Sequence, residues 1–342
     1  MHLPTDYGGL GIHDLNLRRH IAYYTAWRQT AFHTNELLGA DTEHAWKENN
    51  PTTSKHLTAT AAVLQPFTKT PLEIDWADWV ATPPDKHLQK RVLHDAYSTF
   101  HTQLLSKLTP EQQAITRSAG GRGAAAWLYP PKDATTHMSS HHYLTALRYR
   151  THTPITSRTG NNKCQHKNNT RTCQHTLDQH AHHAVTCAIG GYTNTKHNHL
   201  RDVLYHWLCS MGYTCHREQH MPDLDDTDEA GNQRQGIMDI VCHTNTGLAL
   251  IDISVTDAVS ACPKHNASHA RHDGTAATAR EHDKRRRYHD HPDLVPFVFE
   301  TAGRWGTTAE AWLKTVAPTD PRERAETLMQ LRTTSPQPSN GT

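Results

Sequence analysis

The sequence has no long apolar run, almost no net charge and only an odd, scattered set of cysteines, and each absence excludes a class of protein. No segment approaches the roughly 20 apolar residues of a membrane span. Met1 to Leu15 lacks the basic-then-apolar layout of a signal peptide. Seven cysteines in 342 residues argue against a secreted disulfide scaffold and favour metal binding or buried thiols. We therefore expect an intracellular protein with no membrane partner.

A formal net charge of +1 provides no global field that would attract nucleic acid, so such a function has to rest on local basic patches. The clearest candidate is the run Lys284, Arg285, Arg286 and Arg287. It is interpreted either as a nucleic-acid contact or as a solvated helix face or nuclear-import-like patch. Thirty histidines are spread over the whole chain, so a histidine counts as a candidate ligand only when spacing or a partner supports it.

The length allows two or three compact units, and composition predicts four segments. Residues 1–150 form a helical region, with helices expected at Leu17 to Leu38 and Lys90 to Leu108 and with Trp76, Trp79 and Trp127 in cores. Residues 151–192 form a linker, up to Thr172, and a cysteine-containing segment. Residues 193–318 form an α+β domain, and residues 319–342 a short helix and a tail that is disordered from Thr333.

A first set of candidate ligands comprises Cys164, Cys173, His183 and Cys187. On a helix, the spacing of the last pair puts an imidazole and a thiolate one turn apart on one face, so both can reach one tetrahedral zinc ion. Against zinc, His183 is one of several neighbouring histidines, and Cys164 lies far from Cys173 for a tight knuckle. Zinc binding and an unrelated cluster both remain open on spacing alone.

The downstream elements follow the order helix, three strands, helix, strand. A helix is expected over His197 to Leu208 from its amphipathic spacing. Strands are expected over Tyr213 to Glu218, Gly236 to His243 and Leu248 to Thr256, with an acidic loop over Pro222 to Gly231. A helix over Ala276 to Asp290 and a strand over Val295 to Glu300 complete the series.

Two aspartates fall at facing positions of the predicted hairpin. If the turn is centred between Asn245 and Thr246, Asp239 lies directly opposite Asp252, with Cβ atoms about 4.5 to 5.5 Å apart. Two such carboxylates repel unless a cation lies between them, and oxygen ligands favour Mg²⁺ or Mn²⁺ over zinc. Lys284 on the following helix could stabilise charge on a phosphate bound there. The alternative is a solvated hairpin that carries one acid on each strand.

A family resemblance rests on an ordered series of short motifs. The series resembles the carboxy-terminal region of non-LTR retrotransposon reverse transcriptases that carry a restriction-enzyme-like endonuclease. Its members are Asp178 through Cys187, Lys196-His197-Asn198, Gly236 to Asp239, Ile251 to Val255, Lys284 to Tyr288, and Phe299-Glu300-Thr301 through Trp305-Gly306. Leu3-Pro4, Gly8 to Ile12 and Ala126-Trp127-Leu128 look like the segment that joins the polymerase thumb to this region.

The resemblance implies a zinc-knuckle-like segment followed by a PD-(D/E)XK nuclease core with αβββαβ order. It implies that Asp239 and Asp252 bind Mg²⁺ or Mn²⁺, that Lys284 takes the catalytic lysine's role, and that Glu218 is a weaker candidate for an additional acid. The chain departs from the common motif because Ser254 stands two residues after the second acid, where the lysine usually lies. It also departs in the zinc segment, where the family's first two cysteines are close together. His175 could replace a missing ligand.

On this resemblance, the chain nicks target DNA, and the free 3′ hydroxyl primes reverse transcription of the element's RNA, in the nucleus. A polymerase site is not expected, because Asp225-Asp226 lies in a polar acidic segment, so we interpret the chain as a fragment or truncated copy. Two other interpretations stay open. One is a catalytically inactive remnant that binds nucleic acid through residues 284–287 and the histidines. The other is a helical structural adaptor that uses residues 1–150.

Overall fold

The computed structural model describes residues 3–38, 51–121, 123–130, 137–156, 162–228, 230–259 and 263–334. The chain divides into two compact units, which we name the helical unit (Met1–Pro4 and Gly11–Lys107) and the sheet unit (Thr5–Leu10 and Leu108–Thr342). Within the described part of the chain, no helix combines the length and apolar character needed to cross a membrane.

The helical unit is built from helices whose buried sides share one core. α1 spans Leu15–Leu38, α3 Pro51–Leu64, α4 Trp76–Ala81 and α5 Leu88–Leu105, and the 3-10 turn η2 (Gln65–Phe67) follows α3. α1 and α5 confirm the two predicted helices to within about one turn. Trp76 and Trp79 are buried, with ring centroids 5.3 Å apart, and so fill this core as predicted.

Several elements upstream of residue 150 belong to the sheet unit, although the sequence predicts a boundary near that residue. They are η1 (Thr5–Tyr7), α6 (Pro110–Ala119), η3 (Ala126–Leu128) and α7 (Ser140–Arg150). The buried guanidinium of Arg150 donates hydrogen bonds to the carbonyl oxygens of Thr5, Gly9 and Ala119. Since a buried charged donor needs all its acceptors, this one side chain fixes three segments together. Trp127 is half-buried against Tyr143.

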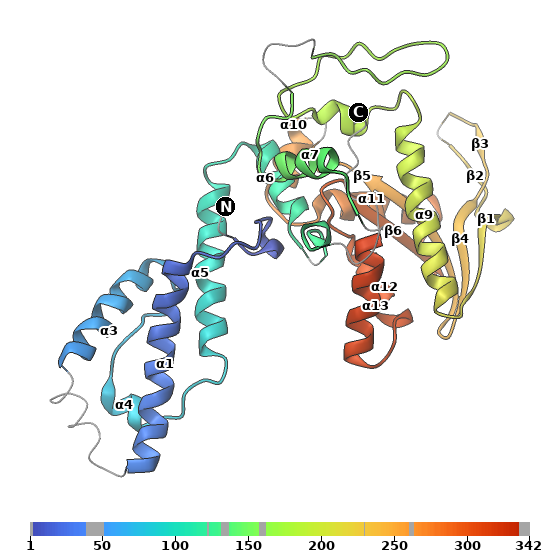
Figure 1. The fold of residues 1–342 in the computed structure, drawn as a ribbon. Coiled ribbons are helices and arrows are strands. Elements are labelled where there is room, and N and C mark those ends of the chain that lie inside the picture. Colours follow the sequence, from blue (N-terminus) through green and yellow to red (C-terminus); the bar gives the residue numbers. More distant parts are fainter. Residues whose placement is uncertain are drawn as a thin grey trace. The chain divides into compact units, whose positions relative to one another are not determined.

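The sheet unit contains a four-stranded mixed sheet, against which helices pack (Figure 1). Its strands are β1 (Thr214–His220), β4 (Ile237–Thr244), β5 (Gly247–Thr256) and β6 (Leu294–Glu300), in the order β1-β4-β5-β6. β1, β4 and β5 are antiparallel neighbours, whereas β6 is parallel to β5. Between β1 and β4, the expected acidic loop (Pro222 to Gly231) instead contains the 3-10 turn η5 (Pro222–Leu224) and strand β2 (Asp226–Thr227). β2 pairs antiparallel with β3 (Gln233–Arg234), which follows the expected loop.

The fold is therefore α+β, and the predicted helix, three strands, helix and strand occur in that order, with β2, β3 and one short helix after β5 in addition. α9 (Tyr192–Ser210) precedes β1, while α10 (Pro263–His269) and α11 (Thr275–Arg287) connect β5 to β6. α8 (His182–Thr186), α12 (Thr307–Val316) and α13 (Pro321–Thr334) complete the described helices. The tail was predicted to be disordered from Thr333, but α13 continues to Thr334, and the tail from 335 onward lies outside the described residues.

The main core joins α9, α12 and α13 to the sheet. Leu200, Leu204, Trp207 and Leu208 of α9 share a cluster with strand residues and with the two C-terminal helices; the buried strand residues include Ile240, Ile251, Ile253 and Phe297. Four α9 side chains at i, i+4, i+7 and i+8 form one helix face, as the sequence predicts. On β5, the alternate residues Asp252 and Ser254 are also buried, because α11 packs against this strand.

Candidate functional site

The β4–β5 hairpin has the register that places its two aspartates next to each other. Thr244 pairs with Gly247 and Ile240 with Ile251, so the turn is centred between Asn245 and Thr246 as predicted. Asp239 and Asp252 occupy the next position along this register. The ladder is interrupted there, because the backbone N–H of Ile253 donates to Oδ2 of Asp239 at 2.6 Å. Both carboxyl groups therefore lie at the same end of the hairpin.

Lys284 reaches this pair from α11. Its Nζ lies 2.5 Å from Oδ1 of Asp252 and 3.4 Å from the carbonyl oxygen of Ile253. The Lys284 and Asp252 residues are only 7% and 6% exposed. Burial lowers the pKa of Lys284, and the Asp252 carboxylate opposes that effect. The structure thus brings together three of the four predicted catalytic residues.

The site concentrates negative charge that the protein alone only partly compensates. Burial, and then the neighbouring Asp252 charge, raises the pKa of Asp239 to about 7. Oδ2 of Asp252 is buried and has no hydrogen-bond partner among the described residues. Tyr288, one turn after Lys284, contacts Asp252, and burial raises the pKa of its phenol. Two close carboxylates with an unused oxygen form a donor set that fits a hard divalent cation.

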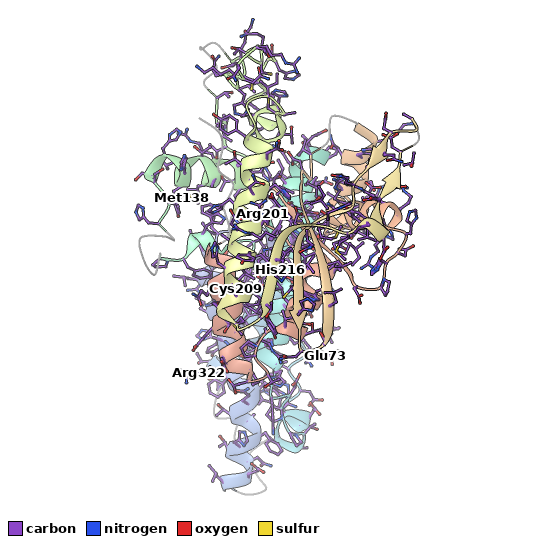
Figure 2. The ribbon with its side chains drawn as sticks, turned by 90° about the vertical axis from the view of Figure 1, so that its right-hand side faces the viewer. Glu73, Met138, Arg201, Cys209, His216 and Arg322 are labelled. Atoms are coloured by element: carbon purple, nitrogen blue, oxygen red, sulfur yellow. The ribbon has the colours of Figure 1, made fainter. Side chains whose placement is uncertain are left out.

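Glu218 lies near the site but has another partner. It stands opposite Asp239 in the β1–β4 register, with a left-handed φ of 53° that interrupts strand pairing. Its side chain is 66% exposed and is ion-paired with Arg201 of α9, which Figure 2 shows next to β1. We infer that Glu218 neighbours the aspartates without completing their cluster.

His197 is a site residue to which sequence reasoning assigned no role. Its Nε2 lies 3.1 Å from Oδ1 of Asp239 and makes no hydrogen bond within the described residues. Burial first, and then the positive charge of Lys284, lower the pKa of His197, which favours its neutral imidazole. The signal was available in Lys196-His197-Asn198, at the start of the predicted amphipathic helix, but the surplus of histidines concealed it.

The four basic residues 284–287 have different partners, although Lys284, Arg286 and Arg287 line one open cavity along α11. Lys284 is buried against Asp252, whereas Arg285 donates to Thr308 and Arg286 pairs with Asp283 at the surface. Arg287 lies over the Tyr288 ring, 4.9 Å from its centroid. Consecutive residues of a helix point about 100° apart, which explains why Arg285 turns to Thr308 of α12 instead.

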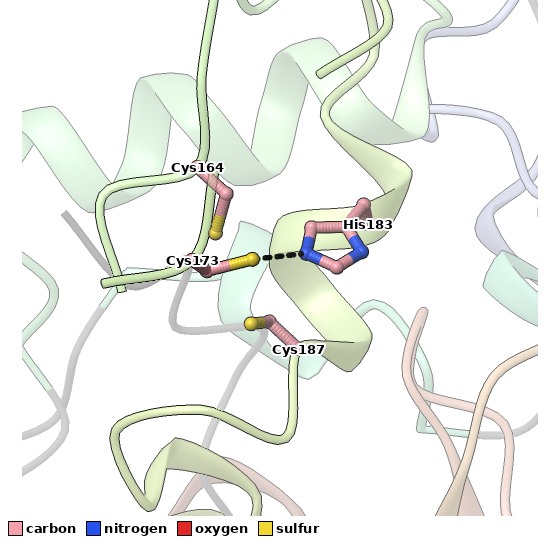
Figure 3. A group of neighbouring side chains, drawn as sticks. All are labelled: Cys164, Cys173, His183 and Cys187. Carbon is pink, nitrogen blue, oxygen red and sulfur yellow. Dashed lines mark hydrogen bonds between the residues drawn. The ribbon is translucent and has the colours of Figure 1, made fainter. Parts of the chain in front are cut away.

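The four predicted zinc ligands form a compact cluster (Figure 3). One donor atom from each of Cys164, Cys173, His183 and Cys187 lies within 4.8 Å of the others. Sγ of Cys173 is 3.2 Å from Nε2 of His183. His183 lies in α8, and Cys187 follows directly after that helix.

A small hairpin explains how two distant cysteines meet. Bridges join Lys163 to Thr176 and Lys167 to Thr172, and the N–H of Cys173 donates to the carbonyl oxygen of His166. The expected linker over residues 151–172 therefore contains one strand of this hairpin. Because the chain folds back, Cys164 and Cys173 lie diagonally across from each other despite their separation in sequence.

The chemistry of this cluster fits a soft or borderline cation. Burial first, and then the neighbouring thiols Cys187 and Cys173, raise the pKa of Cys164 to about 11. A bound cation would remove this penalty by pairing with the thiolates. His175 stacks on His183 with ring centroids 4.0 Å apart but is not one of the four clustered donors. The Cys₃His set can thus hold a metal ion such as zinc.

No protein-family model matches the chain, and a comparison with curated proteins finds no match. The geometry of the two sites is therefore the basis for assigning a function to the chain.

Proposed function

We propose that this chain is a metal-dependent DNA endonuclease of the PD-(D/E)XK type. The observation that carries the proposal is the contact of Asp252 with both Lys284 and the register-adjacent Asp239 at one end of the β4–β5 hairpin. Two carboxylates and one ammonium group, all largely buried, are a combination suited to phosphodiester hydrolysis.

In this proposal, Asp239 and Asp252 hold Mg²⁺ or Mn²⁺ through their carboxylate oxygens. When bound there, such an ion would polarise the phosphate and lower the pKa of a water molecule. The Lys284 ammonium stabilises the negative charge that develops on the phosphate in the transition state. The unpaired Oδ2 of Asp252 supports a cation site, since a buried carboxylate oxygen is costly without a partner.

Lys284 can replace the lysine of the common motif, whose usual position is occupied by Ser254 in this chain. In the common motif the lysine comes from the strand, two residues after the second acid. Here Lys284 comes from α11, and its Nζ reaches Asp252 and the carbonyl oxygen of Ile253. The ammonium group of a helix residue therefore lies beside the Asp252 carboxylate, next to which the common motif places a strand lysine.

The wider setting belongs to the proposal as well. The product would be a nick with a free 3′ hydroxyl, used in the nucleus to prime reverse transcription of a retrotransposon's RNA. The Cys₃His cluster would act as a structural zinc site in the same sheet unit.

A nicking assay tests the proposal. Supercoiled plasmid is incubated with the full chain and Mg²⁺ or Mn²⁺, and the fraction converted to relaxed circles is measured by gel electrophoresis. We expect Asp252→Ala and Lys284→Met to abolish nicking. Arg322→Gln is the matched control, because Arg322 lies in α13 in an exposed pair with Glu326. Equal nicking by the wild type and Asp252→Ala would reject the mechanism.

A binding protein without catalysis is the second candidate. One observation favours it: the Lys284 ammonium already occupies one oxygen of Asp252 and supplies the cation that the carboxylate needs. In that case the chain would bind DNA in a salt-sensitive manner and leave the plasmid supercoiled in both Mg²⁺ and Mn²⁺.

A further inference from the structure

A cavity of about 410 Å³ opens beside the aspartate site. Asp252, Ser254 and Lys284 form one side of it, while Lys196 and His197 from the start of α9 lie on another. Arg280, one turn before Lys284 on α11, is also in its wall. The volume lies in the range of pockets that hold small ligands.

The charged groups of this cavity are unequally paired. Nζ of Lys196 donates to the carbonyl oxygen of Val185 at 2.7 Å, and Nε of Arg280 donates to the hydroxyl of Ser254 at 3.3 Å. Both of these acceptors are neutral. Of the two acids in the wall, Asp252 is paired with Lys284, and Asp257 accepts hydrogen bonds from Thr301 and the N–H of Val259. Among the described residues, Lys196 and Arg280 have no directly bound acid and Asp257 has no directly bound cation, so the wall keeps an excess of one positive charge, which favours an anion in the cavity.

The metal-ligand cluster builds another part of the wall. Val185 and Thr186 line the cavity and lie in the chain between the clustered ligands His183 and Cys187. The carbonyl that holds Lys196 therefore belongs to a segment whose two flanks are fixed by the cluster. The Lys196 side chain is half-buried there, so its ammonium has a defined position.

We propose that this cavity binds one backbone phosphate of a single DNA strand, next to the phosphate that is cut, with Lys196 and Arg280 as the positioning cations. The inference rests on the proposed function and names a subsite of the same nuclease. In this proposal, Lys196 and Arg280 position the DNA strand. Asp239, Asp252 and Lys284 carry out the hydrolysis.

The surroundings favour a strand over a free anion. A second, open cavity of about 660 Å³ runs along α11 and the β2–β3 pair, and it shares Arg280 and Lys284 with the first. The two cavities therefore flank the same two cations. A polymer with one phosphate per nucleotide can occupy both, whereas a single phosphate ion would fill only one.

The test measures binding in the absence of cleavage. A fluorescein-labelled single-stranded oligonucleotide of about twelve nucleotides is titrated with the full chain without added divalent ion, and anisotropy is read at several salt concentrations. We expect Lys196→Met and Arg280→Gln each to weaken binding about tenfold. Each should also lower the slope of log affinity against log salt by about 0.7, the value for one lost contact to a single strand.

Matched variants separate a phosphate contact from a general loss of charge. Lys314→Met and Arg322→Gln each remove one charge from an exposed helix position away from both cavities, and should keep the wild-type affinity and slope. Lys196→Arg should restore most of the binding. Because Arg280 is exposed, its replacement by glutamine leaves the core intact.

Each outcome supports or overturns the subsite. Cavity variants that bind like the two controls would overturn it, and so would displacement of the oligonucleotide by millimolar inorganic phosphate as complete as by unlabelled strand. Loss of binding in the cavity variants but not the controls supports it, even if wild-type chain fails to nick plasmid. That last combination rejects the nuclease while keeping the strand-binding cavity, so the two proposals fail separately.

Discussion

The buried pair of Lys284 and Asp252 makes a quantitative prediction about stability. Each residue is less than a tenth exposed, and the two charged atoms are 2.5 Å apart. Removing one partner of such a pair leaves an uncompensated buried charge, which costs about 3 to 5 kcal/mol. We expect Lys284→Met to destabilise the sheet unit by about 3 kcal/mol, at the low end because methionine keeps most of the apolar stem in place.

A double-mutant cycle isolates the pair from other effects of the substitution. Asp252→Asn and Lys284→Met are made singly and together, so that the double variant has no buried charge at this position. We expect the double variant to be more stable than the sum of the single losses predicts, by about 2 kcal/mol. The exposed pair of Arg322 and Glu326 is the matched control, with an expected coupling below about 0.5 kcal/mol.

The assay must read the sheet unit by itself. Urea-dependent hydrogen exchange with mass spectrometry provides this, because peptides from β4 and β5 are measured separately from peptides of α1 and α5. Free energies additive to within about 0.3 kcal/mol would refute the reasoning, since they would mean that the two charges do not interact in the folded chain.

Three further predictions concern metal binding and helix packing. Purified chain should contain one zinc ion, and Cys187→Ala should lose it by elemental analysis; unchanged zinc content would contradict the assigned ligands. Burial raises the pKa of Asp239 to about 7, so in the ion-free folded state the Asp239 carboxyl group is protonated at acid pH. The stability that this protonation contributes is lost as pH rises through about 7. Mn²⁺ should therefore bind more tightly at about pH 8 than at about pH 6, with release of a proton seen by calorimetry in two buffers, and Asp239→Asn should remove this dependence. Glu281 accepts hydrogen bonds from the N–H and hydroxyl of Thr308 in the first turn of α12, so Glu281→Ala should cost about 1 to 2 kcal/mol in thermal or urea unfolding, whereas a loss under about 0.3 kcal/mol would show that the contact contributes little.

The sequence predicted those parts of the site that local rules determine. A two-residue turn fixes the register of a hairpin, so the turn at Asn245 and Thr246 was enough to place Asp239 beside Asp252. The amphipathic spacing of α9 identified its buried face in the same way. For the metal cluster, one helical turn between His183 and Cys187 gave two of the four ligands from a local rule.

Other features depend on contacts that sequence spacing does not determine. Cys164 meets Cys173 only because a hairpin folds back between them, and its two sides are polar, without the alternating apolar residues that predict a strand. Arg150 joins segments that are far apart in the chain, which moves the unit boundary to Leu108. The separate partners of residues 284–287 were not predicted either, because successive helix residues point about 100° apart and meet different neighbours.

The position of Lys284 also has a consequence for the order of assembly. The lysine lies within the crossover connection that joins β5 to the parallel strand β6, whereas both aspartates lie in a hairpin of short loop length. A nascent chain that has emerged only as far as Thr256 has both carboxylates but not their ammonium partner. The three charged groups meet only after the crossover has packed, and closing a long connection is slow compared with forming a hairpin. Partly synthesised chains therefore lack the assembled site.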